Sequence, residues 1–259
     1  MSSVKIHPTA IVEKGAELGA GVEIGPNCLV GPRAQIGDGT VLRSHVVVEG
    51  VTRIGARNTV YAFSSLGGAP QDTSYKGEET TVEIGDDNIF RESVTIHRGT
   101  VKGRQKTVVG SRNMLMVGCH VAHDCTVGSD NILANQVALA GHVDVEDFVV
   151  IGGIVGITQF CRVGAYSFMG AGTVLRRDLP PFMAAKDFSE VMGPNLVGLK
   201  RRGLTNQQIR TISELYKVFY KSGKTLAACI SELEERFAGD STAERFINFV
   251  KSSKVGIQR

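Results

Sequence analysis

The sequence contains no tryptophan, only 6% of its residues are aromatic, and its formal net charge is only +3. A nucleic-acid-binding surface combines a basic patch with aromatic side chains for base stacking, so nucleic-acid binding is not expected. Nowhere do about 18 apolar residues run together, so no membrane span is expected. The N-terminal segment lacks the apolar core of a secretory signal.

Cysteine and proline are also scarce. The five cysteines are odd in number and include no Cys-x-x-Cys pair. A disulfide framework is therefore not expected, and a cytoplasmic location is predicted. The 7 prolines are far outnumbered by 31 glycines, so the glycines do not mark a disordered linker.

A six-residue repeat fills most of the chain. From Ile6 to Leu66 every sixth residue is apolar, and the frame returns over 84–96 and from Val109 to Leu175, often with glycine next in sequence. A period of six fits the two-residue alternation of a strand and not the 3.6-residue turn of a helix. The repeat therefore predicts a parallel β-solenoid with short strands and tight, glycine-containing corners.

A second row of small or β-branched residues lies four positions after each apolar residue. It includes four of the five cysteines: Cys28, Cys119, Cys125 and Cys161. These are expected to be small buried hydrophobes. Cys125 also lies two residues from His123, which suggests a Cys–His pair, but its phase in the repeat points it into the core.

The repeat is interrupted twice and then stops. The interruptions cover about 67–83 and 97–108, and we expect them to be loop insertions leaving the solenoid wall. A helical period begins near Thr205, where Thr205–Gln208 has the pattern of a capping box, and a second such box is predicted at Ser241–Glu244. The predicted domains are a β-solenoid over 1–186 and a small α-helical domain over 187–259.

Three hexads per turn would give a coil of 18 residues, which stacks His123 below Gly141 and Gln159. Neutral histidine can accept a proton at pH 7, and a glycine beside it leaves room for a substrate and exposes an N–H for an oxyanion. Asp124 would orient this base only if a corner separates the two residues, because neighbours on a strand face opposite ways. The alternative is that these histidines are ordinary solvent-facing corner residues.

A metal site is the main competing interpretation. His97, His120 and His123 are close enough in the repeat to supply zinc ligands. The spacing provides no acidic or cysteine ligand in outward phase beside them, so no metal is the preferred prediction. A metal-dependent or purely structural trimeric solenoid remains the alternative from another class.

Four motifs resemble one family. They are Ile96-His97-Arg98-Gly99-Thr100, His120-Val121-Ala122-His123-Asp124-Cys125, Leu139-Ala140-Gly141-His142-Val143 and Gly198-Leu199-Lys200-Arg201-Arg202-Gly203. They resemble the UDP-N-acetylglucosamine O-acyltransferases of lipid A synthesis over nearly the whole chain. The hexads are similar to the left-handed parallel β-helix of the hexapeptide-repeat acyltransferases, which are usually trimers. The resemblance thus implies an all-β left-handed parallel β-helix with a small C-terminal α-helical domain, assembled as a homotrimer.

The resemblance also implies a reaction and the residues that carry it. A 3-hydroxyacyl group would pass from the phosphopantetheine of acyl carrier protein to the sugar 3-hydroxyl of UDP-N-acetylglucosamine, with no other cofactor. His123 would be the general base, Asp124 its partner, and Gly141 the oxyanion donor. The implied substrate-binding residues are Gln71, Asp72, His120, His142, Gln159, Asn195, Arg201 and Arg202. The basic helical domain would receive the acidic carrier protein.

Several positions depart from the family pattern. Ser74 stands where a lysine is expected, Thr158 replaces a histidine, and Val197 replaces a glutamate. These departures leave open a 3-amino sugar nucleotide as acceptor, which would give an amide. Ala171 occupies a position where glycine can let a long acyl tail pass, so its methyl predicts a shorter acyl chain.

Overall fold

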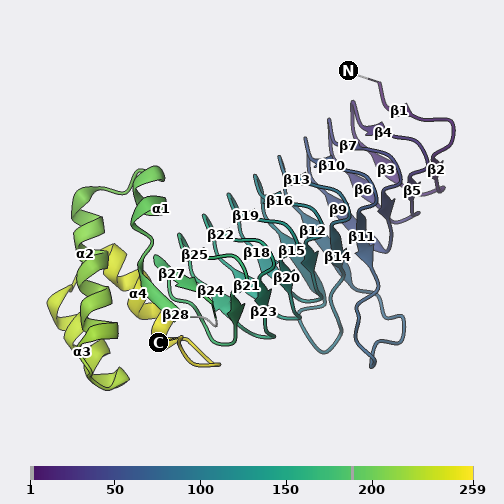
Figure 1. The fold of residues 1–259 in the computed structure, drawn as a ribbon. Helices are drawn as coiled ribbons and strands as arrows, with labels where there is room; N and C mark the ends of the chain where they lie inside the picture. The colour runs from purple at the N-terminus through teal and green to yellow at the C-terminus, as the bar shows by residue number, and fades with distance from the viewer. Residues whose placement is uncertain (1–2, 188–189, 259) are drawn as a thin grey trace.

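The computed structural model describes residues 3–187 and 190–258. It is a three-sided prism of stacked coils, with the N-terminus at one end and a group of helices at the other (Figure 1). Each coil contributes one short strand to each of three parallel sheets, which we name sheets A, B and C. Strands pair with strands one coil away, as Thr126 does with Asp144. The predicted 18-residue coil is therefore confirmed.

Sheet A ends in a hairpin, β27–β28, whose strands are antiparallel. Its strands are β1 (Lys5–Ile6), β4 (Glu23–Ile24), β7 (Val41–Leu42), β10 (Thr59–Val60), β13 (Ile89–Phe90), β16 (Met114–Leu115), β19 (Ile132–Leu133), β22 (Val150–Ile151), β25 (Phe168–Met169), β27 (Met183–Lys186) and β28 (Glu190–Pro194). The predicted domain boundary after residue 186 falls inside this hairpin.

Sheets B and C form the other two faces. Sheet B has β2 (Ile11–Val12), β5 (Leu29–Val30), β8 (Val47–Val48), β11 (Ser65–Gly68), β14 (Thr95–His97), β17 (His120–Val121), β20 (Ala138–Leu139), β23 (Gly156–Ile157) and β26 (Val174–Leu175). Sheet C has β3 (Glu17–Leu18), β6 (Gln35–Ile36), β9 (Val51–Ile54), β12 (Thr81–Ile84), β15 (Lys106–Val109), β18 (Thr126–Val127), β21 (Asp144–Val145) and β24 (Arg162–Val163).

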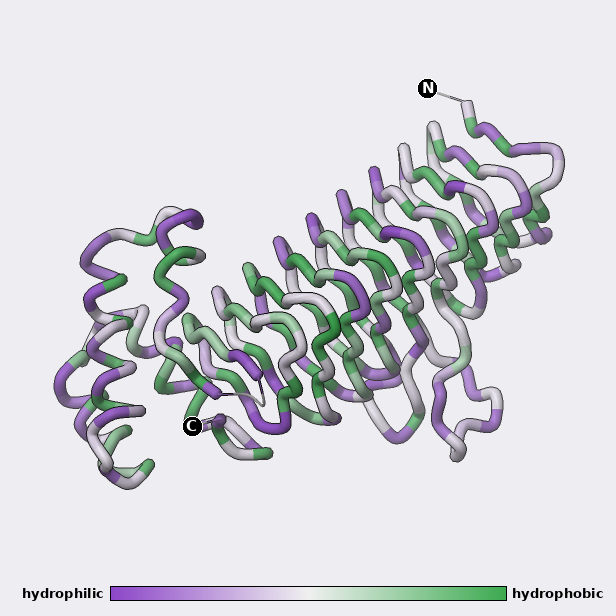
Figure 2. Tube along the Cα trace, viewed as in Figure 1, coloured by the Kyte–Doolittle hydropathy of each residue, from purple (hydrophilic) through white to green (hydrophobic). Residues whose placement is uncertain are grey.

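The core is the narrow interior of the prism. The second residue of nearly every two-residue strand points inward, as Leu115, Val121 and Leu139 do, and all three are fully buried. The predicted second row is buried as well, including the four solenoid cysteines. Hydrophobic and hydrophilic residues alternate along each coil (Figure 2), as the repeat predicts. This row also contains buried asparagines, whose side-chain oxygens accept backbone N–H groups of the next coil, as Asn113 does from Asn131 at 2.9 Å.

The corners contain glycine, as predicted, but only some of their left-handed positions hold one, such as Gly39 (φ 65°). Most left-handed corner positions hold other residues, such as Asp124 (φ 60°) and His142 (φ 63°). Most glycines that follow an inward residue are required by close packing: a Cβ on Gly37 would lie 2.6 Å from the carbonyl carbon of Gly55. The repeat therefore located the glycines correctly, and close packing between coils is a second reason for glycine that the tight corners alone did not predict.

Both predicted insertions leave the prism at the edge between sheets B and C, one between β11 and β12 and the other between β14 and β15 (Figure 1). We call residues 69–80 the first loop and residues 98–105 the second loop. Arg98 of the second loop donates to the Gly67 carbonyl at 2.7 Å and to the Tyr75 hydroxyl at 3.0 Å. The two loops are therefore tied together beside one edge of the solenoid.

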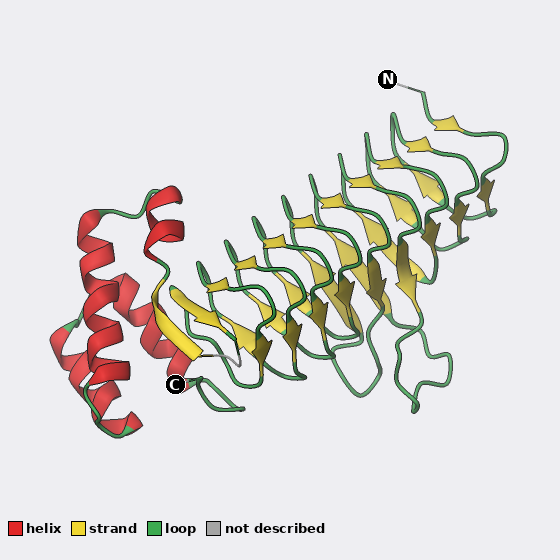
Figure 3. Cartoon of the chain, viewed as in Figure 1, coloured by secondary structure: helices red, strands yellow, loops and turns green. Residues whose placement is uncertain are grey.

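The C-terminal helices gather beyond the last coil (Figure 3). They are α1 (Leu196–Arg201), α2 (Asn206–Tyr216), the π-helical η1 (Lys217–Lys221), α3 (Leu226–Arg236) and α4 (Ser241–Lys251). The predicted capping box at Thr205–Gln208 is present. The second was misplaced by one residue, because Asp240 caps α4. No helix in the described ranges is long and apolar enough to cross a membrane.

Candidate active site

The predicted base lies at the edge between sheets B and C, which we call the histidine edge. It is the column of corners that follows β14, β17, β20 and β23, and it stacks His123, Gly141 and Gln159 in successive coils. The main chain fixes the stack, because the His142 N–H donates to the His123 carbonyl at 3.0 Å. The 18-residue spacing therefore predicted the stacking of these three residues correctly.

His123 and Asp124 form a hydrogen-bonded pair. The His123 Nδ1 lies 2.9 Å from Asp124 Oδ2. Asp124 is 0% exposed and His123 only 8%. The two adjacent side chains can meet because Asp124 adopts a left-handed φ of 60° at the corner, which removes the difficulty seen in the sequence. A carboxylate on Nδ1 leaves Nε2 as the proton acceptor.

Gly141 lies directly against the other side of this imidazole. A Cβ at Gly141 would be 2.5 Å from His123 Cε1 and 2.7 Å from Nε2. These distances are far shorter than a normal contact, so only glycine fits beside the ring. Among the described residues, the Gly141 N–H donates to no backbone carbonyl. The site thus combines a base and a free backbone donor in adjacent coils.

Gly141→Ala is expected to lower kcat by roughly 10²-fold, because the new methyl would displace the imidazole and a displacement of about 1 Å in a catalytic group costs about that much. Steady-state kinetics of the purified variant measure it. Gly153→Ala is the matched control, since its Cβ would approach no atom closer than 3.3 Å. Wild-type kcat in Gly141→Ala would contradict the close approach.

Three further histidines surround the pair. His142 lies at the same edge, with its ring 5.2 Å from that of His123 and stacked on Phe160 at 4.6 Å. His120 bonds the Thr95 hydroxyl through Nδ1 at 2.7 Å, and its ring meets His97 edge-on at 4.8 Å. Burial lowers the pKa of His120 and of His142, and burial with the neighbouring His120 lowers the pKa of His97 to about 4. These three rings are therefore neutral at pH 7.

A cavity of about 450 Å³ opens beside this pair on the outer face of sheet B. Its floor carries small outward residues, Ala138 and Gly156, and its wall includes His120, Gln159 and Gln71 of the first loop. Asp72 follows Gln71, and its pKa is held below the ordinary value by the Ser74 N–H, with a smaller contribution from His123. The first loop thus brings Gln71 and Asp72 to the histidine edge.

Four predicted residues lie elsewhere. Asn195 caps α1, and its amide donates to the Tyr166 carbonyl at 2.9 Å. Arg202 donates to the Asp130 carbonyl at 2.9 Å and covers the Phe148 ring, with exposed Arg201 beside it. These residues sit at the edge between sheets C and A, which a whole face separates from the histidine edge. Ala171 is exposed at the third edge, between β25 and β26.

The possible metal ligands differ from those predicted. Within the described part of the chain, one group of three meets the geometry of a metal site: His123, Asp124 and His142, with ligand atoms within 4.8 Å of one another. The predicted group of His97, His120 and His123 does not. Cys125 is not placed to act as a nucleophile either, because its side chain is fully buried in the core, and this burial raises the pKa of its thiol to about 12.

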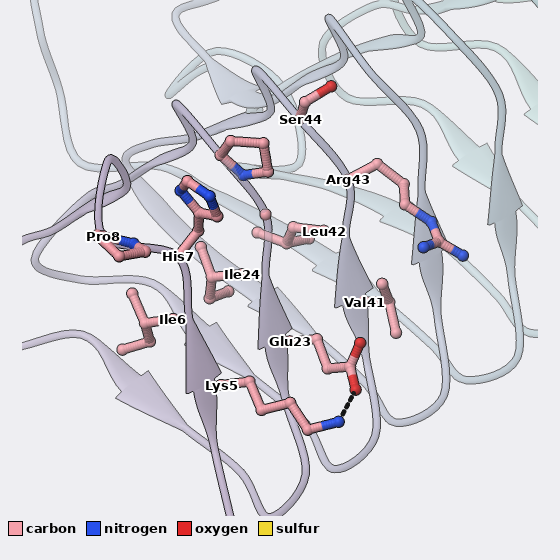
Figure 4. A pocket seen from close by; sticks show the side chains of 12 residues that line it. Lys5, Ile6, His7, Pro8, Glu23, Ile24, Val41, Leu42, Arg43 and Ser44 are labelled. Carbon is pink, nitrogen blue, oxygen red and sulfur yellow. Dashed lines mark hydrogen bonds and ion pairs between the residues drawn. The ribbon is translucent and has the colours of Figure 1, made fainter.

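Two other hollows differ in their distance from the base. A cavity of about 590 Å³ lies on the first coils, where Lys5 pairs with Glu23 at 2.6 Å (Figure 4). A larger groove of about 1230 Å³ runs between sheet C and α4 and reaches His142 and Phe160. This groove is continuous with the histidine edge, whereas the hollow in Figure 4 is not.

Fold and site together define an acyltransferase of the parallel β-helix class. A family model described as UDP N-acetylglucosamine O-acyltransferase, domain 2, matches residues 178–258. LpxA of Acinetobacter baumannii is 43% identical, with a TM-score of 0.95 over 98% of this chain and 99% of that chain. The UDP-N-acetylglucosamine O-acyltransferase of Moraxella catarrhalis is 42% identical, with a TM-score of 0.95 over 98% and 99%. The corresponding acyltransferase of Francisella novicida is 38% identical, with a TM-score of 0.96 over 98% and 94%.

The chain belongs to the UDP-N-acetylglucosamine O-acyltransferase family. Its solenoid is the left-handed parallel β-helix of that family, which confirms the predicted fold class and enzyme class. Sequence reasoning missed the second loop's contribution to the site, where Thr100 and the Arg104 N–H contact Asp124. Its glycine and basic residues marked an insertion but gave no sign of where it folds.

Proposed function

We propose that this chain moves a 3-hydroxyacyl group from acyl carrier protein to the 3-hydroxyl of UDP-N-acetylglucosamine, at the start of lipid A biosynthesis. The observation that carries the proposal is the buried His123–Asp124 pair, 2.9 Å apart, with Gly141 against its free face. The reported activity of relatives that match nearly the whole chain supports the choice of acceptor.

The proposed reaction is one acyl transfer. His123 Nε2 removes the proton of the sugar 3-hydroxyl as the oxygen attacks the thioester carbonyl. The Gly141 N–H stabilises the oxyanion of the tetrahedral intermediate. The carbon–sulfur bond then breaks, and the leaving phosphopantetheine thiolate takes the proton from the imidazolium. Asp124 holds the tautomer and stabilises the transient positive charge. These steps use no metal or resident cofactor.

We propose that a homotrimer completes the substrate site. Asn195, Arg201 and Arg202 lie at a different edge from His123, so one chain cannot offer all of them to one sugar nucleotide. A neighbouring copy would place its own Arg201 and Arg202 beside this histidine edge, where guanidinium groups suit a diphosphate. In the first chain, Gln71 and Asp72 would hold the sugar, His120 and His142 would line the site, and Gln159 would join the UDP end.

The acyl donor and the location complete the proposal. The helical domain exposes basic side chains such as Lys200 and Arg210, which suit an acidic carrier protein, and salt should weaken that encounter. A cytoplasmic site of action is supported by the five cysteines, which are buried and form no disulfide with one another.

The group at the 3-position of the acceptor sugar, a hydroxyl or an amine, decides whether the product is an ester or an amide. A 3-amino sugar nucleotide would give an amide, and Thr158, which lines the cavity, is one of the departures that raise this alternative. We expect kcat/KM to favour the 3-hydroxyl sugar when both acceptors are tested with one 3-hydroxyacyl carrier protein. A preference for the amine would replace the proposed ester product with the amide.

Ala171→Gly is expected to shift the preferred acyl chain toward longer lengths. Removing the methyl makes room for one or two more carbons, and each buried methylene is worth ~0.8 kcal/mol. The ratio of kcat/KM for donors two carbons apart should change by roughly 10-fold or more. Gly153→Ala, at the same prism edge one coil away, is the control. An unchanged ratio would remove Ala171 from the acyl path.

A further inference from the structure

The second loop directs three hydrogen-bond donors to the carboxylate of Asp124. Asp124 Oδ2 accepts from the Thr100 hydroxyl at 2.7 Å, and both carboxylate oxygens lie 3.1 Å from the Thr100 N–H. Asp124 Oδ1 also accepts from the Arg104 N–H at 2.7 Å. With His123 on Oδ2, the buried carboxylate is surrounded by donors, and most of them come from this loop.

The conformation of the second loop suits its contact with Asp124. A turn closes it, with the Thr100 carbonyl accepting from Gly103 and Gln105 at 3.1 Å each. A Cβ on Gly103 would collide with the Asp124 carboxylate, so glycine is required there. The Arg104 side chain turns away to bind Thr126 Oγ1 at 2.6 Å and Asp144 Oδ2 at 2.7 Å. That anchor leaves its backbone N–H aimed at Asp124.

We propose that Thr100 is a positioning residue of the catalytic pair. Its hydroxyl and N–H fix the Asp124 carboxylate, and the carboxylate in turn fixes the Nδ1–H tautomer and the ring angle of His123. This inference rests on the proposed function, because it assigns Thr100 a role through the proposed base. Thr100 is itself buried and acts only through Asp124.

The electrostatics agree with that role. Burial alone would raise the pKa of Asp124, but hydrogen bonds from His123, Thr100 and Arg104 outweigh burial and hold the pKa below its ordinary value. Asp124 is therefore ionised at pH 7, as an acceptor for the imidazole must be. A threonine hydroxyl that can donate only one hydrogen bond is directed to this oxygen.

Thr100→Val tests the inference, because valine keeps the shape of threonine and removes only the hydroxyl. We expect kcat for acyl transfer to fall roughly 10- to 100-fold, as lost hydrogen bonds to a buried charge do, with KM nearly unchanged. Thr100→Ser, which keeps the hydroxyl, should restore most of kcat. Thr40→Val is the matched control, since Thr40 is another buried threonine, hydrogen-bonded to the Gly55 carbonyl at 2.8 Å.

A readout without substrate separates this inference from the proposed function. The downfield proton resonance of His123 Nδ1–H, assigned by its loss in His123→Ala, should weaken or shift in Thr100→Val and persist in Thr100→Ser. If Thr100→Val fails to fold, Thr100→Ala carries the same expectation without added bulk at the site. Wild-type kcat and resonance in the valine or alanine variant, or a serine variant as impaired as valine, would overturn the role of Thr100. An inactive wild type would overturn the proposed function alone.

Discussion

His123→Ala is expected to lower kcat for acyl transfer by roughly 10²- to 10⁴-fold, the usual contribution of a positioned general base. The alanine cannot accept the proton of the sugar hydroxyl, and no neighbour replaces it geometrically. His120 is committed through Nδ1 to Thr95, and His142 points its Nε2 at Asp124, 3.8 Å away. KM should change little, because the loss is confined to the transition state.

Single-turnover assays with saturating donor and acceptor would measure this loss separately from binding. His7→Ala is the control, since His7 is exposed on the first coil and its imidazole is hydrogen-bonded to the nearby Thr9. Full activity in His123→Ala would move the base to another group, with His120 tested next. Activity lost equally in the His7 variant would indicate general damage instead.

Asp124→Asn is expected to produce a comparable fall in kcat, roughly 10²- to 10⁴-fold, because an amide can leave the histidine in the wrong tautomer. The site makes this substitution unusually severe. Asp124 receives donors from His123, Thr100 and Arg104, and an amide oxygen cannot satisfy them all while its NH₂ faces another donor. Stability should fall too, by about 1–3 kcal/mol for the unsatisfied buried groups.

The pH dependence of stability checks the same assignment. The folded pKa of Asp124 is depressed, so its contribution is present above the unfolded pKa of about 3.9 and is lost as pH falls through the folded value. In thermal unfolding, the stability gap between wild type and Asp124→Asn should therefore be constant near pH 7 and begin to narrow as the pH falls below about 4. A stability gap that stays constant down to the lowest pH at which the protein folds would contradict an ionised Asp124.

The sequence predicted those features of the fold that the six-residue repeat controls. A strict repeat fixes which residues point inward, so the core, the buried cysteines and the His123–Gly141–Gln159 stack followed from counting. The capping box at Thr205 could also be predicted, because it depends only on residues close together in the sequence: the side chains of Thr205 and Gln208 accept hydrogen bonds from each other's backbone N–H groups.

Periodicity could not predict features that depend on individual corners and loops. The pairing of Asp124 with His123 needs a left-handed corner that no sequence pattern marked. The fold of the second loop over Asp124 depends on contacts across the coil, as at Thr100. The hairpin β27–β28 carries sheet pairing past residue 186, and the separation of Arg202 from His123 depends on which prism edge each reaches.

The most direct test of the whole account is to incubate the wild-type protein with 3-hydroxyacyl carrier protein and UDP-N-acetylglucosamine and to analyse the sugar nucleotide by mass spectrometry and NMR. We expect a product acylated on the 3-oxygen, formed in proportion to enzyme and nearly absent with His123→Ala. A wild-type protein that leaves UDP-N-acetylglucosamine unacylated while the donor remains intact would contradict it.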